Sequence, residues 1–223
     1  MRLFVLVLVL LALALGLLGA GAFRLLRRAD EAAPAVVAAS LGDARFVYSP
    51  AHARDESTRY GGAVDRLSFI AVAPDFAPPP KPSLDPRRRA AEELDPMRVF
   101  VTLAPREEAL DPAERPSRLY ARFLESEVWS GPGGLVLRRF EAGSPYELEQ
   151  LYLAPPDGRA FFARCPRRDA GFLGSAPCIW ALRWKTVDVE ARFSAPLLRD
   201  WEELAKGLRA FLASIDGASP RPR

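Results

Sequence analysis

The sequence predicts an α+β protein, in which an N-terminal transmembrane helix precedes a mostly antiparallel β-sheet domain covered by a C-terminal amphipathic helix. Residues 187–193 alternate between apolar and charged side chains, which is typical of a half-buried strand. The segment PPDG at 155–158 separates two apolar runs in the manner of an antiparallel hairpin turn. After Ser194, apolar residues recur at spacings of four and three, which predicts a helix with one continuous apolar face.

Strands are predicted where short apolar or alternating runs end at turn residues. Residues 66–72 are apolar on both faces, which favours an interior strand of the sheet. Residues 134–193 should form an antiparallel meander, and the earlier strands should extend it. The predicted strands are residues 44–48, 66–72, 97–103, 135–140, 147–154, 159–165, 178–184 and 187–193.

Helices are predicted over residues 87–94, 116–124 and from Ser194 towards Gly217. The first follows an Asp-Pro pair, in which Asp caps the helix and Pro occupies its first turn. For the last helix, Ser194 is the expected N-cap and Gly217 the expected stop. Its apolar stripe consists of Leu197, Trp201, Leu204, Leu208, Phe211 and Ile215.

The stretch from Leu3 to Phe23 contains no charged side chain. A helix of about 20 apolar residues spans the hydrocarbon core of a bilayer, so this stretch predicts a membrane anchor. Arg24, Arg27 and Arg28 follow it and are placed to meet lipid phosphates. Membrane lipid is therefore the first predicted partner.

Three interpretations of this stretch remain open: a retained signal anchor with the domain exported, a cleaved signal peptide, and an anchor with the domain in the cytoplasm. Ala20 and Ala22 flank Gly21 as in a signal cleavage site, but the apolar run before them is longer than a usual signal core. The arginines after the stretch lean slightly against export, because positive charge favours the cytoplasmic side. We favour the retained anchor, which gives a single-pass protein of the bacterial inner membrane with its domain in the periplasm.

The chain divides by composition into an anchor with its basic flank and one soluble domain. A stalk of small residues is predicted between them, and the domain contains a proline-rich connection. The predicted divisions are 1–28 for the anchor, 29–43 for the stalk, 44–217 for the α+β domain with the connection at 73–86, and 218–223 for a disordered tail.

Cys165 and Cys178 are the only cysteines. Their spacing does not suit a C-x-x-C redox pair, and a single histidine leaves no second pair of zinc ligands. In an exported domain the pair predicts a structural disulfide. The alternative is two unpaired thiols in the core.

The basic character of the chain belongs to the membrane flank. Arg2 and the three arginines after the anchor contribute four positive charges, so the net charge of +3 leaves −1 for the remainder. This balance argues against a nucleic-acid partner. The remaining arginine clusters are interpreted as solvated surface: Arg87–Arg89, Arg138–Arg139 and Arg167–Arg168.

No motif for catalysis, for a metal or for a cofactor is found, so no catalytic residue is assigned and the protein is predicted not to be an enzyme. His52 is the only histidine and lies in a polar segment without a nucleophile motif. Ser175 lies in a small-residue turn inside the predicted disulfide loop. Carboxylates at strand spacing are the only acid–base candidates, and a solvated strand face explains them better. They are Glu147 with Glu149 and Asp188 with Glu190.

The sequence therefore predicts a membrane-anchored periplasmic protein that acts as a non-enzymatic interaction or accessory module of the cell envelope. Three such roles remain open: a part of an envelope assembly, an accessory factor for secretion, and an inhibitor such as an immunity protein against a periplasmic toxin. A protein partner is expected, and its candidate surface is Trp129 together with Pro78, Pro79 and Pro80. The alternatives are a carboxylate-dependent envelope enzyme and a small-ligand or lipid carrier with a cavity under the last helix.

Overall fold

The computed structural model describes residues 36–108, 110–167 and 176–217. The predicted membrane segment, residues 29–35 of the predicted stalk and the C-terminal tail lie outside these residues. Among the described residues, no helix is both long and apolar enough to cross a membrane.

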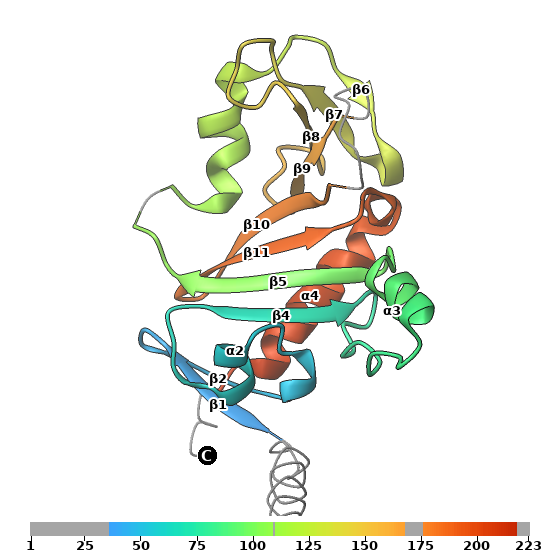
Figure 1. Cartoon of the computed structure of the whole chain (residues 1–223). Helices are drawn as coiled ribbons and strands as arrows, with labels where there is room; N and C mark the ends of the chain where they lie inside the picture. The colour runs from blue at the N-terminus through green and yellow to red at the C-terminus, as the bar shows by residue number, and fades with distance from the viewer. Residues whose placement is uncertain (1–35, 109, 168–175, 218–223) are drawn as a thin grey trace, which may run out of the picture. The chain divides into compact units, whose positions relative to one another are not determined.

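An antiparallel sheet of eight strands forms the centre of the domain, in the order β4-β5-β11-β10-β9-β8-β7-β6 (Figure 1). The meander predicted over residues 134–193 is present, and the two earlier strands extend it beyond β11. The α+β class is therefore confirmed. The strands are β4 (Leu67–Val72), β5 (Arg98–Pro105), β6 (Trp129–Ser130), β7 (Val136–Arg139), β8 (Glu149–Leu153), β9 (Phe162–Pro166), β10 (Cys178–Trp184) and β11 (Val187–Phe193).

The prediction that residues 66–72 form an interior strand is wrong, because β4 lies at the edge of the sheet. Its apolar character has another cause: the chain before β4 covers it. The Arg54 amide donates to the Ser68 carbonyl at 2.9 Å, and the Ser68 amide donates to the Thr58 hydroxyl at 2.8 Å. The side chains of Thr58 and Ser68 are both buried, so this edge is shielded from pairing with another chain.

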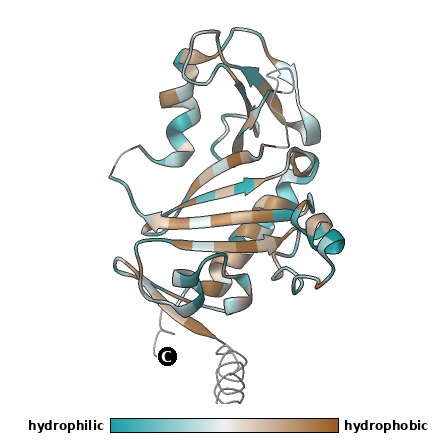
Figure 2. Cartoon of the chain, viewed as in Figure 1, coloured by the Kyte–Doolittle hydropathy of each residue, from teal (hydrophilic) through white to brown (hydrophobic). Residues whose placement is uncertain are grey.

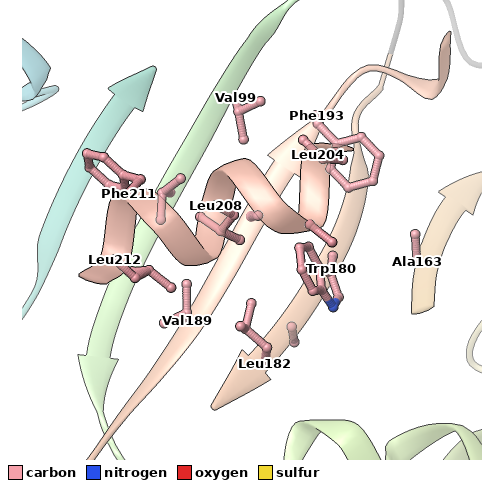
Figure 3. Packing of buried hydrophobic residues seen from close by; sticks show 14 of the residues in the cluster. Val99, Ala163, Trp180, Leu182, Val189, Phe193, Leu204, Leu208, Phe211 and Leu212 are labelled. Carbon is pink, nitrogen blue, oxygen red and sulfur yellow. The ribbon is translucent and has the colours of Figure 1, made fainter. Parts of the chain in front are cut away.

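The C-terminal helix α4 (Trp201–Ile215) packs across one face of the sheet, as predicted. Its apolar stripe meets side chains from β5, β10 and β11, and Leu208 at its centre is fully buried (Figure 3). The buried side chains labelled there include Leu204, Leu208, Phe211 and Leu212 of the helix, and Val99, Trp180, Leu182, Val189 and Phe193 of the sheet.

The start of this helix differs from the prediction. Residues Ala195–Asp200 form the 3-10 helix η6, and the α-helix begins only at Trp201. Ser194 makes no capping hydrogen bond; its hydroxyl donates instead to the Pro96 carbonyl ahead of β5. The helix ends at Ile215, and the Gly217 amide donates to the Arg45 carbonyl at 2.9 Å.

A second sheet of three strands has the order β2-β1-β3, and its strands are β1 (Val37–Leu41), β2 (Ala44–Tyr48) and β3 (Gly62–Ala63). The predicted stalk is therefore wrong over residues 37–41, which form β1. Val37, Ala39 and Leu41 are buried, and the residues between them are exposed, which is the alternation of a half-buried strand. The sequence does not show this pattern clearly, because the alanine and serine side chains of β1 give little contrast in hydropathy between its two faces. The Tyr48 ring of β2 packs edge-on against Phe69 of β4 at 4.9 Å, which joins the small sheet to the common core.

Short helical segments connect the strands. The predicted helix over 116–124 is a π-helical turn followed by a 3-10 turn. The predicted helix over 87–94 is present as α3. These segments are η1 (Pro50–His52), α2 (Glu56–Tyr60), α3 (Pro86–Glu93), η2 (Pro112–Glu114), η3 (Pro116–Tyr120), η4 (Ala121–Phe123) and η5 (Pro132–Gly134).

Cys165 of β9 and Cys178 of β10 form a disulfide. Both residues are buried, and their strands are neighbours in the sheet. The bond therefore closes the connection between β9 and β10, of which residues 168–175 lie outside the described part.

Candidate functional site

The face of the central sheet opposite α4 carries the candidate site. Alternate residues of β5 and β11 point to this face, since their neighbours are buried under the helix. Thr102 of β5 lies opposite Glu190 of β11, and Phe100 lies opposite Arg192. These four side chains are half-buried or exposed. Figure 1 looks onto this face, with α4 behind the strands.

A depression of about 330 Å³ opens on this face. It is lined by Thr102 and Ala104 of β5 and by Asp188 and Glu190 of β11. Its walls come from Arg66, just before β4, and from the connection that follows β5. Glu107, Pro112 and Arg115 of this connection line the depression. The depression therefore joins three segments that are far apart in the sequence.

Asp188, at the wall of the depression, is held by Arg183 of β10. The guanidinium Nε and one of its terminal nitrogens bond the two carboxylate oxygens at 2.7 Å and 3.2 Å. The carboxylate also accepts the Glu107 amide at 3.1 Å. The hydrogen bond with Asp188 is the main reason why the pKa of Arg183 is raised above its usual value. Both carboxylate oxygens of Asp188 are thus engaged in contacts that hold β10, β11 and the connection after β5 together.

The other charges of the depression differ in their pairing. Glu190 bonds Arg192 at 2.7 Å, and the two side chains are 40% and 51% exposed, so the pair is accessible to solvent. Arg66 and Arg115 form no ion pair with any described residue. Arg66 and Arg115 thus line the depression without an ion-pair partner among the described residues, whereas Asp188 and Glu190 are bonded to arginines. Guanidinium groups of this kind can bond a carboxylate through two parallel hydrogen bonds.

The second predicted carboxylate pair lies elsewhere. Glu149 of β8 bonds Arg164 of β9 at 2.9 Å, and that guanidinium lies 5.0 Å from the Tyr146 ring centre. Glu147 precedes β8 and accepts the Gly143 amide at 2.7 Å. Because β9 and β10 separate β8 from β11, the two carboxylate pairs do not meet at one site.

The only histidine has a structural environment. His52 Nε2 lies 3.1 Å from the Phe76 carbonyl oxygen, and its ring centre is 5.1 Å from that of Phe211 on α4. It thereby fastens the chain after β4 to the core. The nucleophile candidate Ser175 lies outside the described residues.

The predicted partner surface is divided by the structure. Trp129 lies in β6, at one end of the central sheet, and is half-buried with Arg139 over its ring at 5.0 Å. Pro78, Pro79 and Pro80 follow the bridge that Ala77 makes with the last residue of β4, at the other end. They therefore do not form one surface with Trp129.

The other predicted site residues lie outside the described part of the chain. They are Leu3, Phe23, Arg24, Arg27 and Arg28 of the anchor, and Ala20 and Ala22 of the candidate cleavage site.

The side chains under α4 are relevant to the predicted carrier function. Phe211 packs against Phe69 and Phe76, with ring centres 5.5 Å and 6.1 Å away. The Trp201 indole donates to the Gly133 carbonyl at 2.9 Å and lies 5.2 Å from the Phe161 ring. Phe211 and Trp201 are therefore packed against neighbouring aromatic side chains, which counts against a ligand cavity next to them.

Sequence comparison gives no relative: the chain matches no protein-family model and no curated protein. Among solved structures, it is similar to Smlt3025, an immunity protein of the Stenotrophomonas maltophilia type IV secretion system. The TM-score is 0.59 at 13% identity, over 82% of this chain and 94% of that chain. At this identity the likeness shows a shared fold.

A second similar structure is FrpD, an iron-regulated outer membrane lipoprotein of Neisseria meningitidis. It matches with a TM-score of 0.49 at 8% identity, over 83% of this chain and 94% of that chain. This likeness is too low to carry an argument.

Proposed function

We propose that the chain is a non-enzymatic, protein-binding module of the bacterial cell envelope, and that it acts as an immunity protein that binds and neutralises a toxin. The observation that carries this proposal is the depression on the open sheet face, where Arg66 and Arg115 have no ion-pair partner among the described residues. An acidic segment of a toxin would supply the missing carboxylates.

The environment of the carboxylates supports a binding role over catalysis. General acid–base work needs a carboxyl group that can gain and lose a proton near the working pH. Asp188 is bonded by Arg183 and by a backbone amide, and Glu190 is bonded by Arg192. The oxygens of both carboxylates are therefore engaged in contacts within the protein, which suits structure and recognition.

The shared fold supports the immunity role within that class. One solved structure with this fold is an immunity protein, and the likeness covers 94% of that chain. α4 packs on one face of the sheet, and the disulfide joins its strands β9 and β10. The open face is therefore a rigid surface, which limits the entropy lost on binding.

The proposed location is the periplasmic side of the inner membrane. The apolar stretch 3–23 supports an anchor there, and the disulfide between Cys165 and Cys178 suits an oxidising compartment. A toxin delivered into the periplasm would thus meet the module at the membrane surface.

A competition experiment tests the proposal. A strain that lacks the chain is grown in contact with its parent, and the survivors of each strain are counted. We expect the parent to kill the deletion strain, and we expect wild-type protein to restore its survival. If the deletion strain survives equally well beside its parent, the immunity role is wrong.

The surface is tested in the same assay with Arg66→Glu combined with Arg115→Glu. This variant should be present at the wild-type level and should fail to protect, because it repels an acidic partner. The matched control is Arg59→Glu combined with Arg199→Glu, which reverses two exposed charges outside the depression. Protection by both double variants would contradict a role for the depression.

A further inference from the structure

The connection between β4 and β5 is far longer than its topology requires. The two strands are antiparallel neighbours, and two to five residues commonly join such a pair. Here β4 ends at Val72 and β5 begins at Arg98, and the Ala73 amide donates to the Met97 carbonyl at 2.8 Å. The chain therefore leaves and re-enters the sheet at one point. We call residues 74–96 the arm.

The base of the arm is fixed to the core. Phe76 is 2% exposed and stacks on Phe211 of α4. Gly207 of α4 allows the arm to approach, since a side chain there would begin only 2.1 Å from the Pro74 carbonyl oxygen. The base is therefore part of the folded domain.

The end of the arm is the helix α3, which is ordered by its own hydrogen bonds. Asp85 caps it by accepting the Arg87 amide at 3.0 Å. The Ser83 backbone is bonded on both sides: its amide donates to Glu92 at 3.0 Å and its carbonyl accepts from Arg89 at 3.1 Å. One face of α3 is thus used to hold the preceding chain.

The opposite face of α3 is exposed to solvent. Arg87, Ala90, Ala91 and Leu94 share it by helical spacing, and none of the eight residues of α3 is buried. Leu94 is 77% exposed, and Leu84 beside the helix is 93% exposed. Figure 2 shows the mixed hydrophilic and hydrophobic colouring of this helix. Burial of its own residues therefore does not explain why the helix is present.

The charges of α3 oppose its dipole. Arginines occupy its first turn and glutamates its last turn, whereas the N-terminus favours negative charge and the C-terminus positive charge. A second α3 in antiparallel orientation removes this conflict. With the two-fold axis near Ala90, Arg87 of each copy lies opposite Glu93 of the other, since both positions are three residues from the axis and both side chains are exposed. A parallel pair would place like charges together.

We propose that α3 is a self-association element, which pairs antiparallel with α3 of a second copy of this chain. The alanines at the axis allow the two helices to approach closely. Leu94 of each copy lies near Leu84 of the other, and the arginine turn of each helix meets the glutamate turn of the other. The arrangement is self-complementary, as a two-fold interface between identical chains must be.

The pairing is weak between free chains. Eight residues of helix are about 12 Å long, which cannot bury the roughly 1,200 Å² of a stable interface. Association should therefore depend on concentration and salt, and it should be strongest where copies are held side by side. Covalent trapping is the suitable measurement.

The experiment uses Ala91→Cys in the full-length chain. Cys165 and Cys178 are bonded to each other, so the new cysteine is the only free thiol. Mild oxidation should give a covalent dimer, and high salt should reduce its yield. Ala142→Cys, at another exposed site, is the matched control and should stay monomeric. Equal dimer yields from the two variants would overturn the proposal.

Charge reversal identifies the second copy as the occupant. In the Ala91→Cys background, Arg87→Glu with Arg88→Glu gives an acidic α3, and Glu92→Arg with Glu93→Arg gives a basic one. Neither should form a dimer alone, and an equimolar mixture should form one. Because Glu92→Arg removes the bond to the Ser83 amide, Glu93→Arg alone, which keeps this bond, is mixed in the same way.

Two results would overturn the proposal at this stage. In the first, neither mixture forms more dimer than its components. In the second, the protein stays monomeric while the acidic α3 variant loses binding to phosphatidylglycerol vesicles, which would assign the helix to a lipid surface.

Discussion

Arg183 and Asp188 face each other across the β10–β11 hairpin, with the guanidinium Nε 2.7 Å from a carboxylate oxygen. Their side chains are only 12% and 15% exposed. The same guanidinium donates to the Glu107 carbonyl at 3.1 Å and lies 3.5 Å from the Asp111 carboxylate. One side chain thus fixes the connection after β5, which forms a wall of the depression.

Asp188→Asn should therefore destabilise both the fold and this wall. It removes the ionised partner of a largely buried guanidinium, and hydrogen bonds to charged groups contribute roughly 1.5–3 kcal/mol. We expect the free energy of unfolding in urea to fall by about 2 kcal/mol. Glu190→Gln, in the exposed pair with Arg192, is the control and should change it by less than about 1 kcal/mol. Equal losses in the two variants would contradict this account.

The disulfide should contribute measurably to stability. Replacing both Cys165 and Cys178 by alanine frees the connection between β9 and β10 in the unfolded chain. A loop of this size contributes about 3 kcal/mol in the chain-entropy model. We expect a lower midpoint in urea for the double variant, and the wild type measured under reducing conditions should match it. An unchanged midpoint would show that the bond adds no stability.

The sequence predicted the elements whose side-chain pattern is strong. β10 and β11 have the predicted bounds, because apolar and charged residues alternate in β11 and the large residues Trp180 and Trp184 share one face of β10. The C-terminal stripe was read correctly as well, since its spacing has few alternatives. The sequence does not predict β1, because its buried face includes the small residue Ala39, and only the fold shows that it pairs with the predicted strand 44–48.

The candidate site was harder to predict than the fold. Asp188 and Glu190 were recognised as one strand face, but Arg66 and Arg115 come from distant segments that only the sheet brings together. The pairing of Asp188 with Arg183 also depends on the register of the hairpin. Charged residues of this kind look like ordinary surface until their partners are known.

The core under α4 should be sensitive to cavity formation. Leu208 is fully buried at the centre of the helix, so Leu208→Ala should lower the free energy of unfolding by roughly 2–5 kcal/mol. Lys206→Ala, on the exposed side of the same helix, should have little effect. Urea unfolding followed by circular dichroism distinguishes the two. A small loss for Leu208→Ala would mean that α4 is not packed on the sheet in solution.

Asp55 should make the stability of the small α2 region dependent on pH. Burial raises the pKa of this carboxyl group, but hydrogen bonds from the Thr58 amide and from the hydroxyls of Thr58, Ser68 and Ser57 outweigh it and lower the pKa to about 2. Because the pKa in the folded protein is lower than the ordinary value of 3.8, the ionised group stabilises the fold above pH 3.8. This contribution is lost as the pH falls towards 2.

Asp55→Ala removes the cap of α2 and should cost about 1 kcal/mol of unfolding free energy at neutral pH. The difference from wild type should shrink between pH 4 and pH 2, where the wild-type carboxyl group gains its proton. Asp55→Asn keeps a capping oxygen without a titrating group, so its own contribution should be independent of pH. Urea unfolding of the three proteins at a series of pH values measures this. If the difference between wild type and Asp55→Ala is the same at pH 2 and pH 7, the carboxylate is not the group that stabilises this region.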